Sequence, residues 1–166
     1  MKAHGVAAVL AALVLPLSGG AVFEAVFADE SAAFAPLMGW WKGEGRLGFQ
    51  EGQTEAVNCR ATYAAGAQAN SLEQSIRCAT ASGKVEIKST IIDNGGQLSG
   101  TWSELVYNMA GELSGAVTER GYRVSVNGGG NLRADMEIIA KDSLQVIEIK
   151  FNGNSLRGLT LVLKKG

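Results

Sequence analysis

The sequence predicts an all-β fold, a single antiparallel up-and-down β-barrel of about 8–10 strands. After residue 29 the chain divides into runs of roughly six to eleven residues rich in β-forming side chains, separated by clusters of Gly, Asn, Asp and Ser. When these runs fold as successive hairpins, one face stays apolar and the other carries the charges. A closed barrel hides such a face and leaves no sheet edge. A two-sheet β-sandwich is the alternative.

The first 28 residues have the layout of a cleavable signal peptide. Lys2 precedes an apolar run over residues 6–15, and Ala28 is a small residue just before the acidic Asp29. We place cleavage after Ala28, which leaves residues 29–166 as one antiparallel β domain, secreted or periplasmic. The apolar run is shorter than the roughly 20 residues that cross a bilayer. The mature protein is therefore not expected to span a membrane.

Composition excludes several chemistries. Residues 1–28 contain Lys2, Glu24 and the single histidine, His4, so the mature chain keeps 14 of 15 basic and 15 of 16 acidic side chains and no imidazole. Serine–histidine and cysteine–histidine catalysis, histidine-rich zinc sites and histidine-ligated haem are thus excluded, and we predict no metal or cofactor. The balanced charge argues against a nucleic-acid partner.

The strands are expected after a short turn over residues 31–38. They cover residues 40–49, 55–63, 71–80, 84–92, 97–106, 111–118, 122–127, 131–139, 144–151 and 156–163. Opposed residues of an antiparallel hairpin share a face, and the expected inward pairs are Leu47 with Val57, Ile87 with Trp102, Glu104 with Leu113, Val117 with Tyr122, and Met136 with Ile147. Outward positions are mostly ionic or hydroxylated, so water must lie outside and an outer-membrane barrel is not predicted.

The two cysteines predict a structural disulfide. A turn near residues 68 and 69 brings Cys59 and Cys78 opposite each other on the inward face of consecutive strands. In an oxidising compartment such a bond contributes roughly 3 kcal/mol. The alternative, a redox or metal-binding pair, lacks the Cys-x-x-Cys spacing and any further ligand.

Strand direction sorts the inward side chains into two ends. Trp41, Tyr63 and Tyr122 gather where the first strand begins and have the bulk to close the barrel. The other end is the candidate ligand site, formed by Phe49, Thr80, Val85, Trp102, Glu104, Leu113 and Phe151. Inward glycines lower the filled volume and favour an apolar cavity. The alternative is that large neighbours collapse into that space.

Gly39-Trp40-Trp41 resembles the Gly-x-Trp element of the lipocalins and of the wider calycin superfamily. The resemblance implies a first strand after a short helical turn, a tryptophan at the closed end and a carrier of lipids or other apolar compounds. The family's Thr-Asp-x-x-Tyr element is missing, and Arg157 is the late arginine that could pack on Trp41 if its register permits. Residues 98–102 also resemble a strand of avidin-type barrels.

We therefore expect an exported, non-enzymatic protein that binds a small apolar molecule inside the barrel. Glu104 alone lacks an acid partner for catalysis and better fits a ligand-anchoring or rim position. Residues 128–130 lack the lysine and helix of a phosphate loop and indicate a flexible turn. The alternative is an envelope interaction or structural module with a filled core. No protein partner is indicated.

Overall fold

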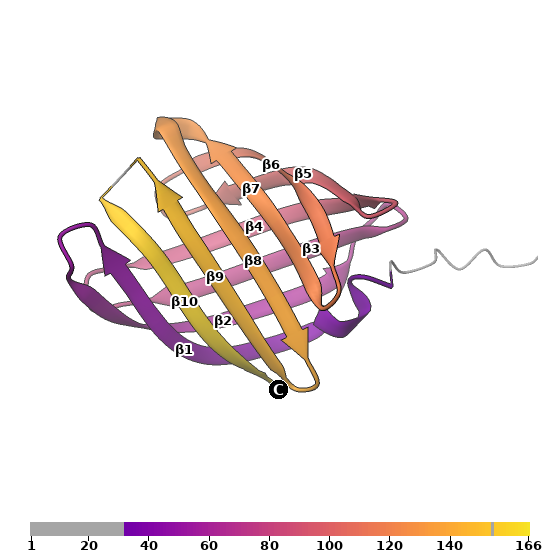
Figure 1. The fold of residues 1–166 in the computed structure, drawn as a ribbon, viewed down its shortest axis with the longest axis horizontal. Coiled ribbons are helices and arrows are strands. Elements are labelled where there is room, and N and C mark those ends of the chain that lie inside the picture. The colour runs from indigo at the N-terminus through magenta and orange to yellow at the C-terminus, as the bar shows by residue number, and fades with distance from the viewer. Residues whose placement is uncertain (1–31, 154) are drawn as a thin grey trace, which may run out of the picture.

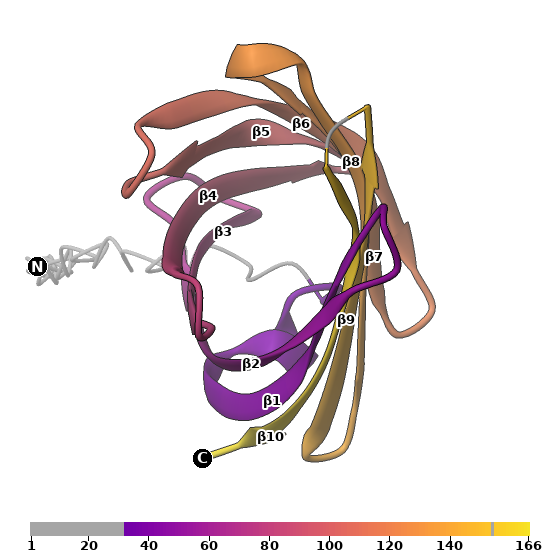
Figure 2. The same ribbon diagram turned by 90° about the vertical axis from the view of Figure 1, so that its left-hand side faces the viewer.

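The computed structural model describes residues 32–153 and 155–166, and within them ten antiparallel strands close into one barrel (Figures 1 and 2). Each strand pairs with its neighbours in sequence, and β10 returns to pair with β1. The strands are β1 (Gly39–Phe49), β2 (Thr54–Ala65), β3 (Ser71–Ala79), β4 (Lys84–Asn94), β5 (Gln97–Glu104), β6 (Met109–Thr118), β7 (Gly121–Gly128), β8 (Leu132–Lys141), β9 (Leu144–Asn152) and β10 (Leu156–Lys165). The predicted all-β barrel is confirmed, and the sandwich alternative is wrong. The predicted signal peptide lies outside the described residues.

Two short 3₁₀ turns complete the elements, η1 (Ala35–Leu37) and η2 (Gly129–Asn131). The turn η1 precedes β1 at one end of the barrel, where the indigo ribbon in Figure 1 lies. No helix among the described residues is long and apolar enough to cross a membrane.

The strand pairings preserve the predicted faces even where they change the predicted partners. Val117 opposes Tyr122 as expected, but Leu47 opposes Glu55 and Ile87 opposes Glu104. The β1–β2, β4–β5 and β8–β9 hairpins are displaced by two residues from the predicted pairing, and the β5–β6 hairpin by four, so that Glu104 pairs with Met109. Because side chains alternate with a period of two, an even displacement leaves every residue on its own face.

The inward glycines allow close approach between neighbouring strands. A Cβ at Gly45 would overlap the carbonyl oxygen of Thr160, and one at Gly111 would overlap that of Asn127. Gly43, Gly100 and Gly115 likewise face a backbone carbonyl of a neighbouring strand. Strands can approach this closely only where a side chain is missing.

The closed end of the barrel has a densely filled core. Phe34 and Leu37, from the segment before β1, are buried beside Trp41. The Trp41 indole donates a hydrogen bond to the Leu37 carbonyl over 2.7 Å, and Phe34 meets Tyr122 edge to face at 6.3 Å. Trp41, Tyr63 and Tyr122, predicted at this end, are all buried. The chain before β1 thus plugs one end of the barrel.

Candidate functional site

The candidate site is a cavity of about 430 Å³ in the opposite half of the barrel. Its walls are mainly apolar side chains from strands around the whole barrel. All seven predicted ligand-site residues line it: Phe49, Thr80, Val85, Trp102, Glu104, Leu113 and Phe151. Its volume falls within the range of small-molecule pockets, about 300–1,000 Å³.

Sequence reasoning missed several lining residues. Met109 was expected in a loop between two strands, yet it lines the cavity, as do Gln74 and the 60% exposed Tyr107. Further lining side chains are Leu47, Val57, Ile76, Ile87, Ser89, Val126, Leu132, Ala134, Met136, Ile149, Leu156, Leu159 and Leu161. Among these, Leu47, Val57, Ile87 and Met136 were predicted to face inward, and the same alternation of side chains is the signal for the others.

Glu104 is buried at the rim of the cavity, where its carboxylate holds the β5–β6 turn. The oxygen Oε1 accepts hydrogen bonds from the backbone N–H of Glu86 at 2.9 Å and of Val106 at 3.0 Å, and Oε2 accepts one from Tyr107 at 2.5 Å. Burial alone would raise the pKa of Glu104, but these three bonds lower it below its ordinary value. These bonds also end β5 at Glu104, two residues before the predicted strand end.

Thr80 has a matching role in the β3–β4 turn. Its Oγ1 accepts hydrogen bonds from the backbone N–H of Ser82 at 3.2 Å and of Gly83 at 3.1 Å. The Ser82 hydroxyl then donates to Glu55 over 2.7 Å. A Cβ on Gly83 would lie 3.3 Å from the Tyr107 hydroxyl, so the two turns approach each other at the rim. Both polar residues predicted near the mouth thus organise loops around it.

Trp102 forms part of the cavity wall in a fixed orientation. Its indole N–H donates a hydrogen bond to the Asn127 carbonyl over 3.1 Å. Gly128 must lack a side chain because a Cβ there would overlap the indole ring. A ring held this way presents its apolar surface to the cavity while its polar atom is satisfied.

Gln74 forms the polar part of the cavity floor. It is 2% exposed, and its side-chain amide interacts with the phenols of Tyr63 and Tyr122 behind it. Tyr63 also donates a 3.1 Å hydrogen bond to Gln145 Oε1. Burial raises the pKa of both phenols, so they are neutral donors at physiological pH.

Cys59 and Cys78 form the predicted disulfide. They are direct cross-strand partners on β2 and β3, and their Cα atoms are 4.2 Å apart. Cys78 also lines the cavity. Because such bonds persist in oxidising surroundings, the disulfide points to an extracellular or periplasmic location.

Trp41 carries a basic partner, but not the expected one. The Lys165 ammonium lies 5.3 Å from the ring centroid of Trp41. Arg157 instead lies beside Gly48, at the other end of β10's pairing with β1. The proposed packing of Arg157 on Trp41 is therefore wrong, because the register sets these residues far apart.

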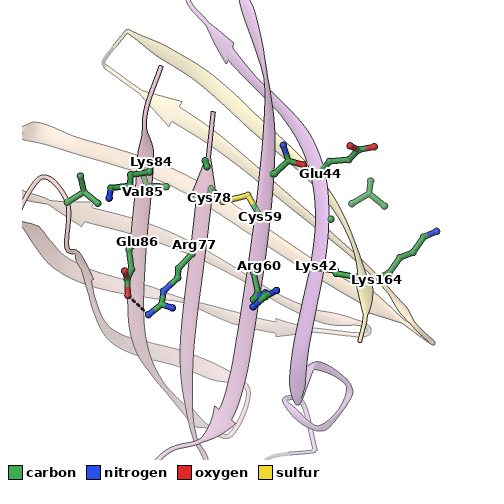
Figure 3. A pocket seen from close by; sticks show the side chains of 15 residues that line it. Lys42, Glu44, Cys59, Arg60, Arg77, Cys78, Lys84, Val85, Glu86 and Lys164 are labelled. Carbon is green, nitrogen blue, oxygen red and sulfur yellow. Dashed lines mark hydrogen bonds and ion pairs between the residues drawn. A yellow bond between two sulfur atoms is a disulfide. The ribbon is translucent and has the colours of Figure 1, made fainter. Parts of the chain in front are cut away.

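A second, more open depression lies across β1–β4 and β10 (Figure 3). Outward charged side chains line it beside the disulfide, among them Lys42, Arg60 and the ion pair of Arg77 with Glu86 at 2.8 Å. Lys42 and Arg60 each stand 5.7 Å from the ring centroid of the exposed Trp40. Its mixed charge contrasts with the mainly apolar lining of the barrel cavity.

The fold is shared with known structures. Rv2717c from M. tuberculosis superposes with a TM-score of 0.64 at 14% identity, covering 83% of this chain and 99% of that one. The S-type phycobiliprotein lyase CPES from Guillardia theta gives a TM-score of 0.49 at 16% identity, covering 78% and 86%. No protein-family model and no curated protein matches the sequence. The likeness to Rv2717c establishes a common barrel fold.

Proposed function

We propose that this protein is an exported, non-enzymatic carrier that binds a small apolar molecule inside its barrel. The observation that carries the proposal is the apolar cavity of about 430 Å³, walled by Trp102, Leu113 and Phe151 and open at the end away from η1. An apolar ligand that enters such a space loses its contact with water, which is the main source of affinity. The calycin-like placement of Trp41 supports the same reading.

Two further observations support binding rather than catalysis. Residues 29–166 contain no histidine, and both oxygens of Glu104 already accept backbone hydrogen bonds. A carboxylate committed to three N–H donors is a poor general base. Export, with cleavage after Ala28, is supported by the disulfide.

The alternative of an envelope module with a filled core describes only half of the molecule. The closed end is filled around Trp41 and Tyr122. The half near Trp102 contains the cavity. We therefore favour the carrier.

Tryptophan quenching tests the proposal at the cavity itself. The chain has three tryptophans, of which Trp40 is exposed, Trp41 is buried at the closed end and Trp102 lines the cavity. Bromodecane, an apolar quencher, should quench the protein saturably, and Trp102→Phe should remove the saturable component. Trp40→Phe is the matched control and should leave that component in place.

Quenching that survives in Trp102→Phe would contradict binding in the cavity. If Trp102→Phe removes the saturable quenching, solvent extraction and mass spectrometry of the protein purified from an exporting host should identify the natural ligand.

A further inference from the structure

The outward face of the barrel carries an apolar stripe on β8, β9 and β10, which lie side by side in Figure 1. Ile139 opposes Val146, and Val146 opposes Val162, so these three side chains form a row across the strands. Leu144 stands two residues from Val146 on the same face. Val162 is 49% exposed and Leu144 is 47% exposed, whereas Ile139 and Val146 are half-buried. Apolar side chains gathered on an outer surface in this way mark a contact with another molecule.

Opposite charges border the stripe on its two sides. Toward the closed end stand Lys141 and Lys164, which oppose Leu144 from the strands on either side of it. Toward the open end stand Glu137 and Glu148, which oppose each other directly. Like charges that face each other across a sheet destabilise it. The two borders therefore do not stabilise the isolated chain.

The charges of the two borders do not pair with each other within the chain. Glu137 pairs with Arg123 at 2.8 Å. Among the described residues, Lys164 and Glu148 form no ion pair. Glu148 opposes Thr160, four residues from Lys164 on β10, which separates the two charges by roughly 13 Å along the strands. A partner for each must come from outside the chain.

We propose that a second copy of this chain docks on the stripe, related to the first by a two-fold axis that runs along the stripe and across the strands. Such an axis places the stripe of one protomer against that of its partner and exchanges the two borders. The lysine border of each protomer then faces the glutamate border of the other. Lys164 of one protomer lies beside Glu148 of its partner, and the symmetry repeats this contact. The proposal is independent of what the cavity binds.

The glutamate border favours a second copy over an anionic membrane. A bilayer of anionic lipids would attract Lys141 and Lys164 but would repel Glu148. A second copy complements both borders at once. Because the barrel wall is convex and the stripe covers three strands, the contact should bury less than the roughly 800 Å² per partner of a standard interface. We therefore expect a weak dimer with a Kd of about 10–100 μM.

Sedimentation equilibrium of the purified protein measures the dimer, and exchange of two charges tests its geometry. Lys164→Glu and Glu148→Lys should each weaken dimerisation about tenfold, because each creates two like-charge contacts. The double variant, which carries both substitutions, should return to the native Kd within about threefold, because the exchanged charges attract again. The two positions are too far apart to interact within one chain, so this recovery reports a contact between chains.

Val146→Asp tests the apolar part of the contact. Val146 is at the centre of the stripe, where an aspartate would lose its hydration against the partner, so the variant should be monomeric. Thr101→Asp adds the same charge at an exposed position of β5 and is the matched control, which should dimerise as the native protein does. Thermal unfolding of both variants shows that each is folded.

Three outcomes would overturn the proposal. The first is a native protein that stays monomeric up to millimolar concentration. The second is a dimer that the two single charge variants leave unchanged, or that the double variant does not recover. The third is a monomeric native protein that sediments with phosphatidylglycerol vesicles when Val146→Asp does not, which would assign the stripe to an anionic membrane.

Discussion

The two ends of this barrel share the same strands but differ in how they are filled. At the closed end, Trp41, Tyr122 and Phe34 pack together, and the chain before β1 adds Leu37 to the plug. At the open end the inward side chains surround a cavity, and the polar residues Thr80 and Glu104 hold turns rather than fill space. The difference shows how one continuous sheet can combine a stabilising core with a binding chamber. Stability should depend on the first end and ligand affinity on the second.

The largest expected effect is a loss of stability when a leucine of the closed end is replaced, compared with a leucine of the open end on the same strand. Leu163 and Leu159 both face inward on β10, but Leu163 is 0% exposed in the closed end, whereas Leu159 is half-buried and lines the cavity. We expect Leu163→Ala to lower the free energy of unfolding by about 3–4 kcal/mol and Leu159→Ala by about 1–2 kcal/mol, because the second site already borders open space. Urea unfolding of both variants measures the difference. Equal losses would contradict the contrast between the ends.

The disulfide connects β2 to β3 beside the cavity, and its removal should have the next largest effect. The double variant Cys59→Ala and Cys78→Ala should lose about 3 kcal/mol of unfolding free energy through the added freedom of the unfolded chain. Reduction of the native protein should give a similar loss in urea unfolding. If the reduced protein unfolds at the same urea concentration as the oxidised one, the bond is not a structural contributor.

The smallest expected effect concerns the rim and depends on pH. The folded pKa of Glu104 is lowered, so its contribution is present above the ordinary carboxyl pKa and is lost as the pH falls through the folded value. Near neutral pH, Glu104→Gln should cost about 2 kcal/mol of unfolding free energy, because an amide cannot accept all three N–H groups. Below about pH 4 the difference in unfolding free energy between the native protein and the variant should become smaller.

Glu112, an exposed residue on β6, provides the control for Glu104. Glu112→Gln should have the same unfolding free energy as the native protein across this pH range. If the loss of unfolding free energy in Glu104→Gln stayed constant down to strongly acidic pH, packing and not the carboxylate would hold the turn.

The sequence predicted the face of each strand better than its partners. Val57 and Ile87 lie inside as expected although their hairpins are displaced, because the alternation survives any even displacement. Turn lengths depend on local contacts that composition does not reveal. The carboxylate of Glu104 stops β5 early by binding three backbone N–H groups, and no pattern of apolar residues encodes that.

The candidate site was predicted in outline, but not all of its lining residues were. The alternation of side chains placed Trp102, Leu113 and Phe151 inward, and strand direction placed them at one end, where they line the cavity. Gln74, the cross-strand partner of Tyr63, borders both the closed-end core and the cavity. A glutamine at an inward position between Leu72 and Ile76 was the available signal, and only the structure shows that it reaches the cavity wall.

Diffraction from crystals of the mature protein under xenon pressure tests the central claim most directly, because xenon enters apolar cavities. The account predicts xenon density in the open half, among Trp102, Leu113 and Met136, and none around Trp41. Crystals that take up no xenon in the open half, or take it up equally at both ends, would contradict the division of the barrel into a filled core and a binding chamber.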